Sequence, residues 1–161
     1  MDHIDQILAQ WQRERPELDA WPMAPIGRMY RLFNYLAGDI EAVHKQGGLT
    51  TGEFDVLATL RRSGAPFRLT PTSLFQTAML SSGAMTNRLN QLEKRGLITR
   101  LPAEDDRRSL LVQLTDTGRE LIDNMVEAHL EKERELLSAL SGKEQETLNQ
   151  IFKKWLRAFE E

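Results

Sequence analysis

The 161-residue sequence contains no cysteine. Without a thiol the chain can form no disulfide, no thiolate nucleophile and no sulfur-ligated metal site. It also lacks an apolar run of 18 residues, so no transmembrane helix and no membrane partner are expected. The amino terminus, MDHIDQ, has neither the basic flank nor the apolar segment of a signal peptide. These absences predict a cytoplasmic protein.

Groups that support catalysis or bind metals are also scarce. The only histidines are His3, His44 and His129, and none has a close metal-ligand spacing, which disfavours a zinc-sensing protein. Asp105 and Asp106 are adjacent in a charged, turn-like segment, and they lack the burial that separates the pKa values of a catalytic acid and base. We therefore expect no metal, no cofactor and no enzymatic activity.

The charge is unevenly distributed along the chain. The net charge of -3 is the sum of -4 over residues 1–60 (5 basic, 9 acidic), +5 over residues 61–108 (9 basic, 4 acidic) and -4 over residues 109–161 (7 basic, 11 acidic). A basic segment between acidic ends is typical of a polyanion-binding face, although solvated charge can cluster in the same way.

Apolar periodicity and capping signals predict a mainly helical chain. Alternating residues predict two strands, at 97–101 and 110–114, joined by a charged tip. Thr117 and Glu120 are spaced as a capping box for the next helix, and Ser141 and Glu144 for the last one. The expected helices cover about 4–15, 26–47, 51–63, 70–79, 81–95, 117–140 and 141–159.

Three short helices followed by a two-stranded hairpin indicate a winged helix-turn-helix, in which the third helix enters the DNA major groove. At 100° per residue, Met85, Leu89 and Leu92 face the core. The opposite face of an ordinary amphipathic helix is polar too, but small and amide side chains suit a groove. The predicted DNA-contacting residues of this helix are Ser82, Gly83, Thr86, Asn87, Asn90 and Gln91.

Three motifs resemble the MarR-type transcription regulators: LEKRGLI at 92–98, DRR at 106–108 and LTDTG at 114–118. The resemblance implies an intertwined homodimer that binds a pseudopalindromic operator in double-stranded DNA, and we expect it to act as a repressor. The implied domain runs over 25–161, with the winged helix-turn-helix at about 51–116 and dimerisation helices at about 25–47 and 117–161. Residues 1–24 form an extra helix and linker.

The charged tip of the hairpin is expected to contact DNA as well. Arg107 and Arg108 are the predicted contacts, with Arg108 entering the minor groove while Asp106 restrains the arginines. Gly118 is expected to relieve crowding where the strand becomes a helix.

Arg88 lies about 60° from Met85 on the helical wheel, beside the apolar stripe, and so is poorly aimed at a groove. An arginine near apolar surface needs an anionic partner, and Asp55 is a candidate for a purely structural ion pair. A second resemblance, to the urate-responsive branch of the MarR family, implies instead an effector site formed by Trp11, Asp55, Arg88 and Arg100. Two guanidinium groups and an indole suit a planar aromatic anion such as urate. A different phenolic or aromatic acid, and a helical dimeric interaction protein that binds no DNA, remain alternatives.

Overall fold

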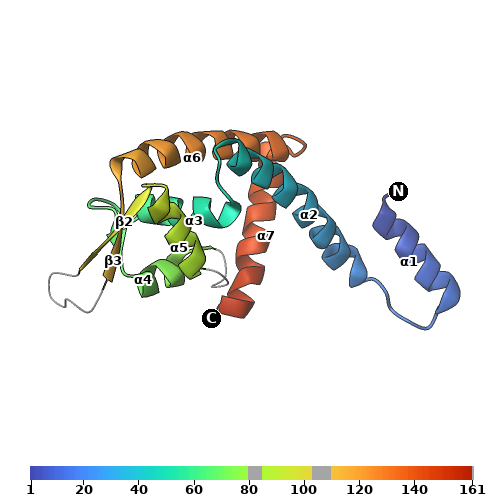
Figure 1. Ribbon diagram of the computed structural model, residues 1–161. Helices are drawn as coiled ribbons and strands as arrows, with labels where there is room; N and C mark the ends of the chain where they lie inside the picture. The colour runs from blue at the N-terminus through green and yellow to red at the C-terminus, as the bar shows by residue number, and fades with distance from the viewer. Residues whose placement is uncertain (80–84, 103–109, 161) are drawn as a thin grey trace. The chain divides into compact units, whose positions relative to one another are not determined.

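The computed structural model describes residues 1–79, 85–102 and 110–160 (Figure 1). Within these residues it is mainly helical with a small antiparallel sheet, as predicted. None of the described helices is long and apolar enough to span a membrane. In chain order the elements are α1 (His3–Glu14), α2 (Met23–Gln46), α3 (Thr51–Arg62), β1 (Arg68–Leu69), α4 (Pro71–Thr77), α5 (Met85–Lys94), β2 (Ile98–Pro102), β3 (Leu110–Leu114), α6 (Asp116–Leu137) and α7 (Gly142–Glu160).

The chain divides into two compact units, Met1–Asp39 and Ile40–Glu161. In the first unit, Asp2 caps α1 by accepting a hydrogen bond from the backbone of Asp5. Arg28 of α2 pairs with the carboxylates of both Asp2 and Asp5, and the Arg28 hydrogen bond lowers the pKa of Asp2 to about 2. Ile4 of α1 is buried, so polar and apolar contacts together hold α1 on the start of α2.

The core of the second unit is built from α3, α5, the sheet and α6. Leu57, Leu60, Leu92 and Val112 are fully buried in it. Burying each such side chain contributes about 1.5–3 kcal/mol to folding. The buried apolar residues of α3 include Phe54, Val56, Leu57 and Leu60.

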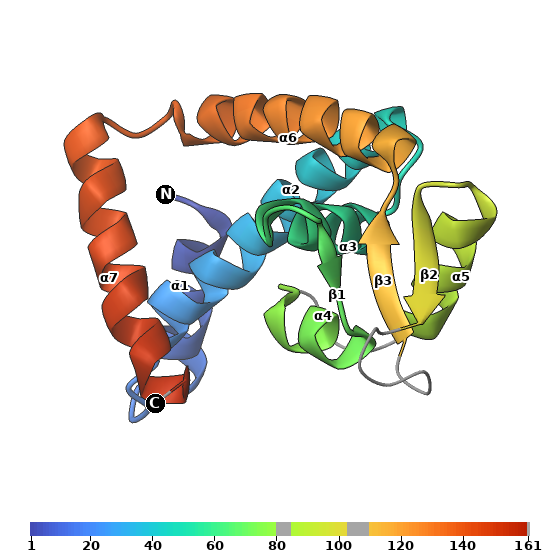
Figure 2. The ribbon, with the colours of Figure 1, turned by 90° about the vertical axis from the view of Figure 1, so that its left-hand side faces the viewer.

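The sheet has three strands in the order β1-β3-β2, side by side in Figure 2, where the sequence predicts a two-stranded hairpin. The additional strand, β1, pairs Arg68 with Gln113 and Leu69 with Val112. Two residues are too few to display an alternating pattern, so β1 leaves no periodic signal in the sequence. The β2–β3 ladder extends from Ile98 opposite Leu114 to Pro102 opposite Leu110.

The junction between β3 and α6 is tightly packed. A methyl group on Gly118 would collide with the carbonyl oxygen of Leu97, which confirms that only glycine fits here. The predicted cap at Thr117 is wrong, because Thr115 caps α6 by accepting a hydrogen bond from the Gly118 backbone at 3.0 Å. Thr115 also donates to the Gly96 carbonyl at 2.7 Å, a contact distant in the sequence that spacing rules do not consider.

A buried histidine joins the end of α2 to α3 and α6. His44 is 1% exposed, and its ring nitrogens lie 3.2 Å from Oγ1 of Thr51 and 3.1 Å from Nδ1 of His129. Burial, together with His129, lowers the pKa of His44 to about 4, against an opposing effect of Glu41. The His44 ring also stacks on Phe54, with centroids 4.0 Å apart. Although two histidines meet here, the described residues contain no group of three or more His, Asp or Glu side chains placed to hold a metal ion.

Candidate nucleic-acid interface

Helix α5 presents two chemically distinct faces. Leu89 and Leu92 are buried and Met85 packs against the core, as the helical wheel predicts. The exposed residues of the helix include Thr86, Asn87, Asn90 and Gln91. The predicted DNA-contacting residues of α5 that the structure describes therefore form one solvent-exposed polar surface, whereas Ser82 and Gly83 lie outside the described residues.

Close packing against α3 fixes the orientation of α5. A methyl group on Gly52 would lie 2.6 Å from Cζ of Arg88, so the guanidinium of Arg88 rests on the backbone of α3. This contact agrees with the prediction that Arg88 points away from the polar face. Gly52 itself was not predicted to matter, because a glycine in the first turn of a helix carries no signal of what approaches it.

Asp55 lies three residues after Gly52 on α3 and is 8% exposed. Its carboxylate oxygen Oδ1 accepts a hydrogen bond from the backbone of Met79, just beyond α4, at 3.2 Å. Asp55 therefore ties the residues after α4 to α3, which contacts α5. Asp55 and Arg88 lie on neighbouring helices, as both the ion-pair and the effector-site interpretations require.

Arg100, on β2, is hydrogen-bonded to helix α5. One guanidinium nitrogen donates to Glu93 at 3.0 Å and the other donates to Oδ1 of Asn90 at 2.8 Å. The strand register places Arg100 opposite the buried Val112, on the face of β2 that packs toward the core and α5. Nothing in the sequence connects Arg100, predicted to bind an effector, with Asn90, predicted to contact DNA.

Trp11, the fourth residue of the predicted effector set, is 38% exposed on α1 in the Met1–Asp39 unit. The other three residues, Asp55, Arg88 and Arg100, belong to the Ile40–Glu161 unit. The set thus draws on both units. Its joint role remains a prediction.

The tip of the predicted wing lies outside the described residues. The β2–β3 ladder is described as far as the pair Pro102 and Leu110. Arg107 and Arg108, together with Asp106, lie outside the described residues. Their predicted contact with DNA therefore remains an expectation.

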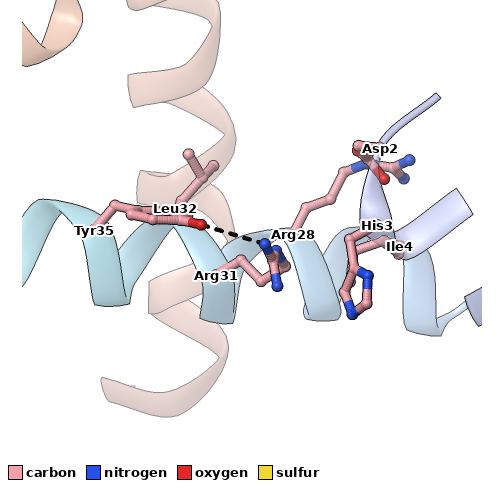
Figure 3. Close-up of a pocket in the computed structure, with 7 residues that line it drawn as sticks. All are labelled: Asp2, His3, Ile4, Arg28, Arg31, Leu32 and Tyr35. Atoms are coloured by element: carbon pink, nitrogen blue, oxygen red, sulfur yellow. Dashed lines mark hydrogen bonds and ion pairs between the residues drawn. The ribbon is translucent and has the colours of Figure 1, made fainter. Parts of the chain in front are cut away.

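The Met1–Asp39 unit contains a cavity of about 260 Å³ (Figure 3). Arg31 and Tyr35 face one another there, with Nη2 of Arg31 donating to the Tyr35 hydroxyl at 3.3 Å. The second guanidinium, that of Arg28, is already paired with two carboxylates. Its lining residues are Asp2, His3, Ile4, Arg28, Arg31, Leu32 and Tyr35.

Comparison with known proteins finds similarity to transcriptional regulators along most of the chain. The sequence model of the MarR family matches residues 49–110. The HTH-type transcriptional regulator PecS of Dickeya dadantii is 40% identical over 148 residues, covering 92% of this chain and 89% of PecS. The multiple antibiotic resistance protein MarR of Salmonella typhimurium is 32% identical, over 67% of this chain and 74% of that protein.

Solved structures extend the likeness to the fold. The crystal structure of a mutant MarR from Escherichia coli complexed with operator DNA matches with a TM-score of 0.73 and 26% identity, covering 86% of this chain and 99% of that one. AbsC of Streptomyces coelicolor, a MarR family transcriptional regulator, matches with a TM-score of 0.78 at 20% identity, covering 89% of this chain and 97% of that one. The second likeness concerns the fold alone.

Proposed function

Because this chain belongs to the MarR family of DNA-binding transcriptional regulators, and is not an enzyme, we propose that it represses transcription by binding a pseudopalindromic operator as a homodimer. A small aromatic anion, urate in the first instance, weakens that binding. The observation that carries the proposal is the polar face of α5, exposed along its length while the opposite face is buried in the core.

In this proposal α5 enters the major groove. Asn87, Asn90 and Gln91 carry amide groups that can donate to or accept from base edges, and Thr86 carries a methyl group that can contact thymine. Ser82 and Gly83, which precede Met85 in the sequence, are proposed to contact the DNA as well. The buried residues Leu89 and Leu92 hold the helix while its other face binds.

Arg107 and Arg108 are proposed to bind the minor groove beside each half-site. A narrow minor groove has an enhanced negative potential that favours an inserted arginine. Replacing Arg108 by Ala is expected to weaken operator binding by about tenfold or more, consistent with the loss of 1–3 kcal/mol for a specific contact. Unchanged affinity would exclude the minor-groove role.

The homodimer is supported by apolar side chains that the single chain leaves exposed on α2 and α7. Large apolar side chains exposed on each of two helices indicate an interaction site. Two copies joined through these helices would place two α5 helices on one duplex, as a pseudopalindrome requires. The proposed dimerisation segments are 25–47 and 117–161, with 1–24 as an added element. The exposed large apolar residues on the two helices include Tyr30, Leu32, Phe33, Tyr35, Ile151, Phe152, Trp155, Leu156 and Phe159.

The effector site proposed for a planar aromatic anion comprises Trp11, Asp55, Arg88 and Arg100. Arg88 rests against α3 and Arg100 grips α5 from β2, so an anion that recruits both guanidinium groups acts directly on the recognition helix. Such a switch requires the anion to bind the form with low DNA affinity more tightly.

Fluorescence anisotropy with the DNA upstream of the protein's own gene tests this function. Wild type should bind at fixed salt, and urate should weaken the binding, whereas Arg88→Ala should bind DNA yet lose the response. Arg95→Ala is the matched control, since Arg95 lies just after α5 and its side chain pairs with Glu53 at 3.6 Å. A response to salicylate but not to urate would replace the effector by another aromatic acid. A normal urate response of Arg88→Ala would discard the site.

A further inference from the structure

The contact between Arg100 and Asn90 joins a strand to the exposed face of the recognition helix. The guanidinium spans one turn of α5, donating to Asn90 through Nη2 at 2.8 Å and to Glu93 through Nη1 at 3.0 Å. The Arg100 side chain is 25% exposed, and the Glu93 side chain 38%. The ion pair with Glu93 thus anchors the Arg100 guanidinium beside Asn90.

An arginine side chain can only donate hydrogen bonds. This property determines which end of the Asn90 amide faces Arg100. An Asn side chain has an acceptor oxygen and a donor NH2 group, which exchange places when the amide flips by 180°. Facing Nη2 of Arg100, the amide must present Oδ1. The flipped amide would oppose two donors and lose a charge-assisted hydrogen bond, which is about twice as strong as a neutral one.

The Asn90 NH2 group is consequently directed away from Arg100, while Asn90 itself is exposed. We infer that Arg100 is a positioning residue for sequence specificity: it locks the Asn90 amide so that the side chain acts as a hydrogen-bond donor toward the DNA bases. This inference rests on the proposed function, in which the exposed face of α5 enters the major groove.

The locked amide selects among bases by their major-groove edges. Purines present the N7 acceptor and guanine also O6, whereas cytosine presents an N4 amino donor. A donor from Asn90 therefore matches guanine and opposes cytosine. If the amide could flip, its oxygen would accept from the cytosine amino group and the discrimination would disappear. Glu93 contributes indirectly, because it holds the guanidinium at the position from which Nη2 reaches Asn90.

The test is selection of bound duplexes from a random-sequence pool, followed by measurement of affinity for single-base variants of the best site. The proteins are wild type, Asn90→Ala, Arg100→Met, Arg100→Lys and Arg95→Met. Arg100→Met removes the donors but keeps an unbranched side chain of similar length, whereas Arg100→Lys remains a donor without an acceptor. Arg95→Met loses the same charge next to the same helix, where the Arg95 side chain pairs with Glu53.

In wild type, one position in each half-site should favour guanine over cytosine by about fivefold or more, the scale of a single specific base contact. Asn90→Ala should abolish this preference. Arg100→Met should reduce it to within about twofold at that position alone, since an unlocked amide serves both bases. Arg100→Lys and Arg95→Met should retain it. The loss of one positive charge lowers affinity for all sequences alike, and the ratio between bases cancels this effect.

Several results would overturn the inference. If Asn90→Ala weakened binding equally for every sequence, Asn90 would contact phosphate and read no base. An Arg100→Met protein that folds, by circular dichroism, and keeps the wild-type preference would show that Arg100 does not set the amide. If neither wild type nor Arg95→Met enriched any duplex, the proposed DNA-binding role of α5 would fail, and the inference with it. The first two results leave the proposed function intact.

Discussion

The core of α3, α5, the sheet and α6 differs from the terminal helices α2 and α7 in how far its apolar side chains are exposed to solvent. In the core, Leu57, Leu60 and Val112 are almost completely shielded from solvent. On α2 and α7, large side chains such as Phe33, Trp155 and Phe159 are exposed, and α7 has no buried residue. The core completes its burial within one chain, while the terminal helices carry surface suited to a second copy. Stability should therefore depend on the core, and assembly on the terminal helices.

The largest expected effect comes from placing a charge among the exposed apolar side chains of the terminal helices. Phe152→Asp places a charge within the exposed apolar stripe of α7, where the desolvation of a carboxylate opposes association. We expect the proposed dimer to dissociate in sedimentation velocity experiments, and operator affinity to fall by about 100-fold because two linked half-site contacts become one.

Gln150→Asp provides the control for this change. It adds the same single negative charge at an exposed position of α7, about 160° from Phe152 on the helical wheel. This variant should remain dimeric. Equal dissociation of both variants would show that net charge, and not the apolar stripe, governs assembly.

The next effect tests the core through pH. Folded His44 binds a proton only near pH 4, whereas an unfolded histidine does so near pH 6.5, so the unfolded state binds more protons between these values. The resulting stability is fully present above about pH 6.5 and is lost as the pH falls toward 4. The free energy of unfolding should decrease by on the order of 3 kcal/mol over this range.

Urea denaturation at several pH values measures the His44 effect. His44→Gln keeps hydrogen-bonding groups but cannot titrate, so its stability should depend less steeply on pH in this window. His3→Gln, at an exposed position of α1, should retain the wild-type slope. Identical slopes for wild type and His44→Gln would mean that the buried ring does not control the acid response.

A smaller effect probes the junction between β3 and α6. Gly118→Ala forces a methyl group onto the carbonyl oxygen of Leu97 and should cost about 2 kcal/mol, as overpacking of a core does. Gly142→Ala, at the first residue of α7, meets no described atom within 4 Å and should leave the melting temperature nearly unchanged. If calorimetry gave equal losses for both, the contact with the Leu97 carbonyl oxygen would not explain the effect of Gly118→Ala.

The smallest effect distinguishes the observed cap of α6 from the predicted one. Thr115→Ala removes the side chain that accepts from Gly118 and should cost about 1 kcal/mol in urea denaturation. Thr117→Ala changes an exposed residue inside the helix and should stay within about 0.5 kcal/mol of wild type. A greater loss for Thr117→Ala would restore the cap predicted from the sequence.

Sequence periodicity predicted the parts of the fold that repeat over several turns. Helix α5 shows its buried and exposed faces in the spacing of Met85, Leu89 and Leu92. Short or long-range features escaped it. Strand β1 has only two residues, and the choice of Thr115 over Thr117 as cap depends partly on Gly96, which lies 19 residues away.

The candidate site was predicted as residues but not as contacts. From the sequence, Asn90 was predicted to contact DNA and Arg100 to bind an effector. Neither spacing nor residue type reveals that β2 lies against α5, so their contact was not predicted. Their hydrogen bond depends on the strand register that turns Arg100 toward the helix. Likewise, nothing in the sequence around Gly52 indicates that a guanidinium rests there.

The central claim is that the exposed face of α5 binds duplex DNA together with basic side chains. The most direct measurement is the affinity for the DNA upstream of the protein's own gene over a series of salt concentrations, with wild type and Asn87→Ala. We predict that log K falls linearly with log salt at about -0.9 per neutralised phosphate, and that Asn87→Ala binds more weakly with a similar slope. An affinity for this and other promoter DNA that does not vary with salt, or that Asn87→Ala leaves unchanged, would contradict the account.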